Sequence, residues 1–200
     1  MSESQWERHI EALSHRNALV FMAILIERML INLRFYAALT GLEQARRADT
    51  ALALVWEALM TPAARIDFLL QEEKLAALEK ALEEAGDSFG ARTAGDALLA
   101  LSTLLESMAT DRKDGAIEVA RLSRHGIAAL VMAQSDEVLS ASEWQQRIEA
   151  HPLMDDERAF QASVLDRLAE DGTSPEALKA LRHFGRNGGV SNLGLSLEDA

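Results

Sequence analysis

The sequence has 200 residues, 48% of them hydrophobic and 26% charged, which is ordinary for one globular domain or two small ones. The formal net charge of −12 disfavours partners such as nucleic acid or anionic membranes, because an acidic surface repels phosphate groups. The chain has no cysteine, which excludes disulfides, thiolate catalysis and thiolate metal ligands. Abundant Ala and Leu, with only 3 Pro, indicate an all-α protein.

Residues 4–15 predict a short amphipathic helix, because Trp6, Ile10 and Leu13 recur at the helical period. The N-terminal residues lack the basic start and the apolar stretch of a signal peptide. We therefore expect a cytoplasmic protein.

Residues 18–39 are the most apolar stretch of the chain, and we predict that they form a central helix. Nine consecutive apolar residues, 18–26, precede the charged pair Glu27 and Arg28, and further apolar residues follow. The apolar run is too short to cross a bilayer, which takes about 20 such residues. A helix that is apolar all round belongs in the middle of a core. Gly41 suits the end of this helix, because glycine tolerates a positive φ.

Helical periodicity and capping residues divide the rest of the chain into further helices. Thr61 with Pro62 is expected to open one of them, Ser140 or Ser142 another, and Thr173 or Ser174 the last. The expected ranges are about 43–60, 62–84, 91–110, 115–138, 142–150, 152–170 and 175–184.

These elements predict an all-α fold: a compact single-domain bundle of about eight helices around residues 18–39, spanning residues 1–200. Residues 185–200 predict an extended tail. Leu193, Leu195 and Leu197 alternate within it and need cover, so we expect the tail to pack on the bundle.

Acidic residues in apolar surroundings give the candidate polar cluster. Glu27, Glu57, Asp67 and Asp96 lie on four different predicted helices, and Arg28 completes the set. Buried charges need partners, and the side chains of adjacent helix residues diverge by about 100°. We therefore expect Glu27 to meet an arginine of another helix or backbone amides, and Arg28 to meet one of the other three acids. The alternative is that the arc carrying Glu27 and Arg28 faces water.

No motif assigns catalytic, cofactor-binding or metal-binding residues, and we expect neither a cofactor nor a metal. Carboxylate-bridged metal sites in helical bundles need Glu-x-x-His motifs, which this sequence lacks. The pairs Glu72-Glu73 and Glu83-Glu84 are superficially similar to motifs of helical nucleotide pyrophosphohydrolases, but a solvated helix face fits them better. Residues 185–189 are similar to a phosphate-binding loop only in their glycine content.

Several segments resemble the YjaG-like family of bacterial proteins of unknown function. They include Phe21-Met22-Ala23, Glu27-Arg28-Met29, residues 55–59, residues 64–68, Asp96-Ala97 and Ser191-Asn192-Leu193-Gly194. The resemblance extends from about residue 21 to residue 195 and implies a compact all-helical cytoplasmic domain, with no established reaction to carry over. Where family members often have a cysteine and a proline, this chain has Ile26 and Ile31, which implies an unkinked central helix without a thiol.

Two function hypotheses stay open at this point. The first is a non-enzymatic helical protein that binds an unidentified protein partner, or itself as a homodimer, because apolar helix surface is abundant. The second is a ligand- or metal-binding protein, or a hydrolase, that uses buried carboxylates with Arg28. Convergence of the acids on an open pocket would favour the second, whereas dispersal or closure on basic partners in a dry core would favour the first.

Overall fold

A computed structural model describes residues 3–61, 63–110, 112 and 114–199 of the chain. Within these residues the regular structure is helical, apart from one antiparallel bridge between Val190 and Ser196. The α-helices are α1 (Glu3–Glu11), α2 (His15–Thr40), α3 (Arg46–Met60), α4 (Phe68–Glu73), α5 (Ala76–Glu84), α6 (Phe89–Ala109), α7 (Gly115–Ala133), α8 (Ala141–Glu149), α9 (Pro152–Glu170) and α10 (Pro175–Gly185). Short 3-10 helices cover Glu43–Ala45, Asn187–Gly189 and Leu197–Asp199. The predicted all-α fold class is confirmed.

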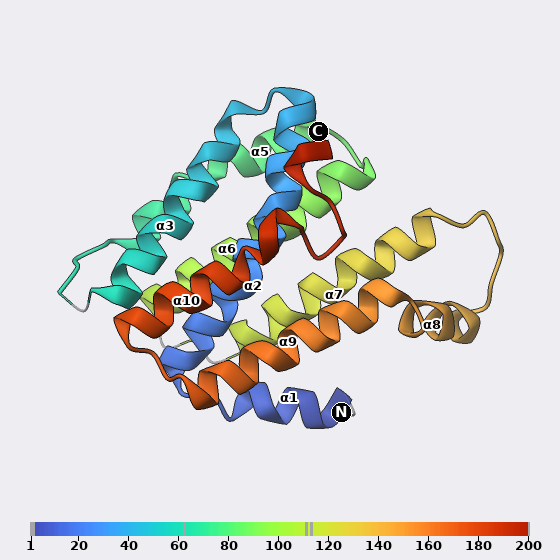
Figure 1. Cartoon of the computed structure of the whole chain (residues 1–200). Coiled ribbons are helices and arrows are strands. Elements are labelled where there is room, and N and C mark those ends of the chain that lie inside the picture. The colour runs from blue at the N-terminus through green and yellow to red at the C-terminus, as the bar shows by residue number, and fades with distance from the viewer. Residues whose placement is uncertain (1–2, 62, 111, 113, 200) are drawn as a thin grey trace.

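Helix α2 is the centre of the bundle (Figure 1). Every residue from 19 to 33 is buried, and α6 packs along α2 most extensively, followed by α7 and α10. Ser14 caps the start of α2 by accepting a hydrogen bond from the Asn17 N–H, and Gly41 ends it at φ 72° with its N–H donating to the Ala37 carbonyl. The helix is uninterrupted through Ile31, as the absence of a proline predicts.

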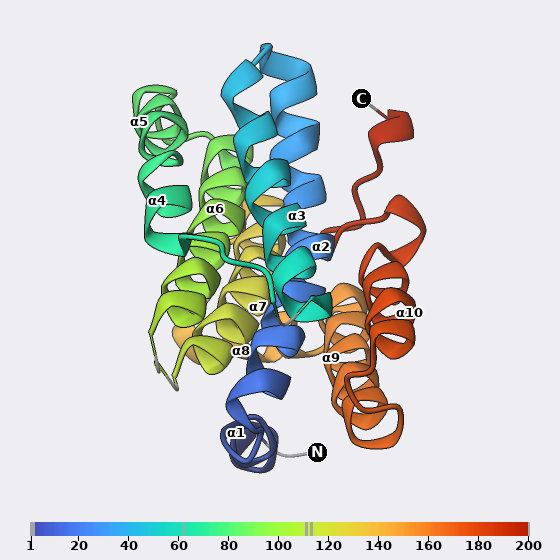
Figure 2. The same cartoon turned by 90° about the vertical axis from the view of Figure 1, so that its left-hand side faces the viewer.

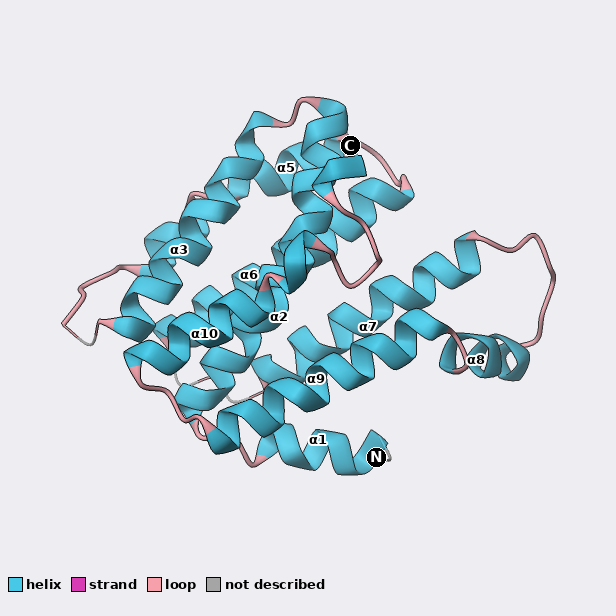
Figure 3. Ribbon diagram, viewed as in Figure 1, coloured by secondary structure: helices cyan, strands magenta, loops and turns pink. Residues whose placement is uncertain are grey.

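The remaining helices lie around α2 on both sides (Figure 2). Helices α4 and α5 border α6 at one edge, while α9 and α10 lie at the other. Helices α3 and α10 both contact α2, and α9 contacts α2 and α7. Figure 3 shows α8 at the periphery of the bundle, after the loop that leaves the end of α7, and α8 contacts α7 and α9. Within the described residues, none of the helices combines the length and apolarity that a membrane span requires.

The helix expected between Thr61 and Glu84 is interrupted, so that part of the prediction was wrong. Thr61 is the extended C-cap residue of α3, and residues 63–67 are not helical. Helix α4 begins only after Asp67, whose carboxylate accepts a hydrogen bond from the Leu70 N–H at 3.0 Å. The capping carboxylate fixes the start of the helix there, because it satisfies an N–H that has no partner inside the helix. Pro62, the expected first helical residue, lies outside the described residues.

The segment after α10 folds into a tight loop against the bundle. The Ser191 N–H donates to the Leu195 carbonyl at 2.9 Å, and the Ser191 hydroxyl accepts from the N–H groups of Leu193 and Leu195. Gly194, at φ 76°, makes the turn between them. Ser191, Asn192 and Leu193 are buried, and Leu193 joins a small apolar cluster with residues from α7 and α9. That residues 1–200 form one domain stays a prediction.

Candidate functional site

Glu27 and Arg28 lie on neighbouring positions of α2 and point into two different polar regions. Both side chains are buried, with 2% of Glu27 and 7% of Arg28 exposed. Their divergence follows from the helix, which rotates by about 100° per residue. One region is closed and the other is an open pocket.

The closed region, here called the buried network, is built on Glu157 of α9. Glu157 is fully buried, and one of its carboxylate oxygens accepts a hydrogen bond from the Arg28 guanidinium at 2.8 Å. The other oxygen accepts from the Ser123 hydroxyl at 2.6 Å and from the Gln161 amide at 2.7 Å. Burial raises the pKa of the Glu157 carboxyl, while the Arg28 charge and these two hydrogen bonds oppose the rise. The Arg28 guanidinium also lies 4.6 Å from the centre of the Phe160 ring.

Asn192 of the C-terminal segment completes the buried network. Its side-chain amide donates to the Ser123 carbonyl at 2.8 Å, and its side-chain oxygen accepts from Asn32 of α2 at 2.9 Å. Within the described residues, Arg28 Nε and Asn32 Oδ1 are buried atoms without a hydrogen-bond partner. The network thus ties α2, α7, α9 and the C-terminal segment together, and its closure favours a structural role.

The open region, here called the tail pocket, begins at Glu27. Arg182 of α10 donates from Nε to Glu27 Oε1 at 2.7 Å, and Arg186 Nε lies 3.8 Å from Oε2. A pocket of about 560 Å³ opens over these groups, between α2, α3, α10 and the C-terminal segment. Arg34 of α2 and Asp49 of α3, paired at 2.8 Å, line another part of its wall. The pocket therefore collects charged groups from four segments.

The five residues of the candidate polar cluster do not come together. Glu57 is exposed on α3, and Asp67 is exposed at the start of α4. Asp96 is partly buried on α6, with Oδ2 3.6 Å from His125 Nδ1, and burial raises the pKa of its carboxyl against the opposing effect of His125. These three acids lie apart from Glu27 and Arg28 in the contacts that the structure records.

The expected partner of Arg28 was wrong. Arg28 pairs with Glu157 rather than with one of the three predicted acids, because the face of α2 that carries Arg28 packs against α9. The expected arginine partner of Glu27 is present as Arg182. A signal for Glu157 existed in the sequence, since it shares a helical face with Phe160 and Val164, three and seven residues later. Nothing local in the sequence points to Arg182 or Arg186.

Metal binding has no support in the described part of the chain, where no three His, Asp or Glu side chains gather closely enough to hold an ion. The Glu27 carboxylate faces arginines, and the Glu157 carboxylate faces Arg28, Ser123 and Gln161. Both carboxylates are thus engaged by hydrogen-bond donors.

Comparison with known proteins places the chain in a family. Residues 5–196 match the family described as "Protein of unknown function (DUF416)". The chain belongs to the DUF416 family. The uncharacterised protein YjaG of Escherichia coli K12 is 32% identical over 190 residues, which cover 93% of each chain. An uncharacterised protein of Haemophilus influenzae is 29% identical over 191 residues, covering 94% of this chain and 95% of that protein.

A solved structure shares the fold of this DUF416 chain. The crystal structure of a DUF416 family protein from Shewanella baltica OS155 has a TM-score of 0.83 and 26% sequence identity, covering 95% of this chain and 97% of that one. These comparisons confirm the resemblance to YjaG-like proteins and the all-α fold. They indicate a family of unknown function, so any activity must be argued from the site.

Proposed function

We propose that this protein is a non-enzymatic ligand-binding protein and that the tail pocket is its binding site. One observation carries the proposal: a carboxylate that is almost fully buried, that of Glu27, lies at the edge of an open pocket between two arginines. Burying a charge is costly, and a fold that needs only stability does better with apolar residues there. The volume of about 560 Å³ lies within the range of small-molecule sites, roughly 300–1,000 Å³.

The composition of the pocket supports binding rather than hydrolysis. Its described lining residues include Ser196 but no histidine, lysine or tyrosine, and two of its three carboxylates, Glu27 and Asp49, already accept hydrogen bonds from arginines rather than from that hydroxyl. The fully buried Glu157 is shielded from solvent, which separates it from any substrate in the pocket.

Ligand-observed NMR with a mixed panel of small anionic, cationic and neutral compounds tests this proposal. Ser196→Trp places a bulky side chain in the pocket wall, and Ser142→Trp, at an exposed position on α8, is the matched control. We expect at least one compound to bind the wild type and the control and to lose binding to Ser196→Trp, with all three melting at similar temperatures. If no compound binds, or if Ser196→Trp binds as the wild type does, the proposal fails.

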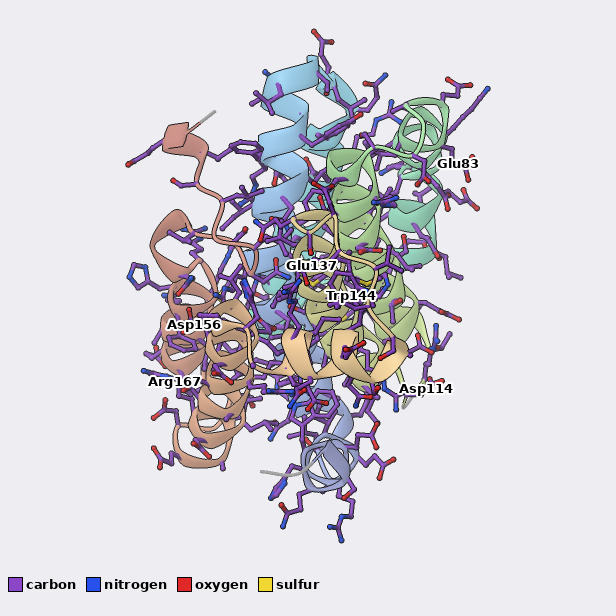
Figure 4. All side chains as sticks on the ribbon, turned by 90° about the vertical axis from the view of Figure 1, so that its right-hand side faces the viewer. Glu83, Asp114, Glu137, Trp144, Asp156 and Arg167 are labelled. Carbon is purple, nitrogen blue, oxygen red and sulfur yellow. The ribbon has the colours of Figure 1, made fainter. Side chains whose placement is uncertain are left out.

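Self-association as a homodimer is the second candidate, and α8 with the loop before it favours this function. Helix α8 has no buried residue, Val138 in the preceding loop is fully exposed, and Met132 at the end of α7 is 47% exposed. Figure 4 shows Glu137 and Trp144 in this region. Light scattering after size exclusion should give a dimer mass that Val138→Ser lowers and that Leu99→Ser, at an exposed apolar residue of α6, leaves unchanged. A monomer mass at high concentration would eliminate the homodimer. This surface would then be left as a binding site for an unidentified protein partner.

We place this binding function in the cytoplasm. A chain of 200 residues without cysteine is typical of proteins that fold without disulfides, which supports a reducing compartment. The net charge of −12 supports ligands other than nucleic acid or anionic lipid. Fractionation of cells that express the tagged chain, with recovery in the soluble cytoplasmic fraction, is the corresponding measurement.

A further inference from the structure

Among the described residues that line the tail pocket, Arg186 is the arginine whose hydrogen-bonding capacity is wholly unused. The single carboxylate of Glu27 lies between two arginines, and Arg182 Nε donates a hydrogen bond to its Oε1 at 2.7 Å. Arg186 reaches only to 3.8 Å from Oε2, which is beyond hydrogen-bond distance, and its side chain is 57% exposed. In the described part of the chain, the Arg186 guanidinium donates no hydrogen bond. Its five N–H groups are therefore available to a ligand.

The charges around the pocket set the charge of that ligand. Arg34 is paired with Asp49 and Arg182 with Glu27, so Arg186 is the arginine of the described lining that has no hydrogen-bonded carboxylate. Glu198 is exposed and also lines the pocket, so the described lining has three arginines and three carboxylates and a formal charge of zero. A ligand with several negative charges would meet three carboxylates here and a chain of net charge −12, so the single free guanidinium of Arg186 fits a ligand with one negative charge.

The uncharged residues of the lining indicate the polarity of the rest of the ligand. Ile31 and Leu52 contribute apolar wall from α2 and α3, and Leu197, 46% exposed, contributes from the C-terminal segment. Gly188 and Gly189, which follow α10, also line the pocket, and no atom lies within 4 Å of where their Cβ atoms would be. The approach to Arg186 along these glycines is therefore free of side chains.

We propose that the ligand class of the tail pocket is an organic monocarboxylate with an apolar body, held by Arg186. This inference rests on the proposed binding function of the pocket. The guanidinium of Arg186 binds the carboxylate by two parallel N–H···O bonds, the geometry that favours arginine over lysine for this group. Arg182 is held by Glu27 and lies 5.7 Å from the Trp56 ring, so it serves as a fixed neighbour. The apolar body lies against Ile31, Leu52 and Leu197.

Isothermal titration of the full chain with octanoate tests the ligand class. Octylamine, which has the same apolar body and the opposite charge, and ATP, which carries several negative charges, are the comparison compounds. We expect octanoate to bind, octylamine not to bind, and ATP to bind more weakly than octanoate. We also expect octanoate to slow the hydrogen exchange of amides in residues 188–189 and 196–198, since these residues form part of the wall.

Two matched variants locate the binding group. Arg186→Gln removes the charge in the pocket, while Arg147→Gln makes the same change on α8, where Arg147 pairs with Glu137. We expect Arg186→Gln to weaken octanoate binding about tenfold or more, because it removes a charge-assisted bond, and Arg147→Gln to leave it unchanged. Unchanged octanoate binding by Arg186→Gln would overturn the inference.

The outcomes separate this inference from the function on which it rests. If octylamine or ATP binds better than octanoate and Ser196→Trp abolishes that binding, the ligand class is wrong and the pocket is still a binding site. If octanoate does not bind while another compound of the panel binds in the pocket, the ligand class is again wrong and the pocket is still a binding site. If nothing binds in the pocket, both the function and the ligand class are wrong.

Discussion

Removing Arg28 should destabilise the fold severely, because Glu157 would be left buried without its counter-ion. In Arg28→Met the carboxylate, fully buried on α9, loses the donor at 2.8 Å and keeps only Ser123 and Gln161. Breaking one side of a buried ion pair costs about 3–5 kcal/mol, a large share of a domain's stability of roughly 5–15 kcal/mol. The loss of the Arg28–Phe160 contact adds to this penalty.

Urea unfolding followed by circular dichroism measures the loss. A loss of 3 kcal/mol or more would lower the midpoint by about 1 M or more at the usual slopes. Arg147→Met is the control, because it breaks an exposed pair with Glu137 and should cost about 0–1 kcal/mol. The double variant Arg28→Met/Glu157→Met should recover much of the loss, since removing both charges leaves no unpaired ion.

The loss in Arg28→Met should also depend on pH with a definite sign. Burial already raises the pKa of Glu157, and removing Arg28 takes away the largest opposing effect, so the pKa rises further. Below the unfolded-state value of about 4.3 the carboxyl is protonated in both states, and the deficit is smallest. The stability deficit of the variant relative to the wild type grows as the pH rises from the folded-state pKa of Glu157 in the wild type toward the higher one in the variant. In this range the variant must keep the proton on the buried carboxyl, while its unfolded state releases it readily. A loss below about 1 kcal/mol that is constant with pH would refute the reasoning.

Three further substitutions test the packing and polar contacts. Gly185→Ala should lower the free energy of unfolding by about 1–3 kcal/mol, because the new Cβ would lie 3.0 Å from the Ile24 carbonyl oxygen. Gly95→Ala, whose Cβ would have no atom within 4 Å, should raise the free energy of unfolding by up to about 1 kcal/mol. Equal effects of the two substitutions in urea melts would contradict this. Asn192→Ala should cost about 1–3 kcal/mol in the same assay, because the Asn32 side-chain amide loses its acceptor and the bond to the Ser123 carbonyl is removed, and a neutral result would mean that water replaces the Asn192 side chain. Asp96→Asn should remove a loss of stability that the wild type shows as the pH rises above about 3.9, because burial raises the folded-state pKa of Asp96; parallel pH profiles of the two proteins would exclude this.

The sequence predicted most helix ends because those ends depend on local chemistry. Ser174 caps α10 with Pro175 as its first residue, and Ser140 forms a full capping box with Glu143. The sequence does not predict the break at residues 63–67, because Asp67 between apolar neighbours fits a core acid as well as the N-cap residue that it is. Propensity alone did not decide between these two roles.

The candidate site was only partly predictable, for two physical reasons. Apolar neighbours in sequence do not bury a helical residue: Trp56 is fully buried, whereas Glu57, rotated by about 100°, is exposed. Partners of a buried charge come from tertiary packing, and Glu157 lies 129 residues from Arg28, while Arg182 lies 155 residues from Glu27. One sequence without aligned relatives carries no record of such pairs.

The late position of these partners sets the order in which the fold can be completed during synthesis. Helix α2 leaves the ribosome early, carrying Glu27, Arg28 and Asn32 in its most apolar surroundings, but Glu157, Arg182 and Asn192 are made only after α8. Through most of translation at about 5–20 residues per second, the central helix exists with unpaired charges and uncovered apolar surface. Closing such distant contacts is slow, and nascent chains of this protein are therefore expected to need protection by chaperones until the C-terminal segment has docked.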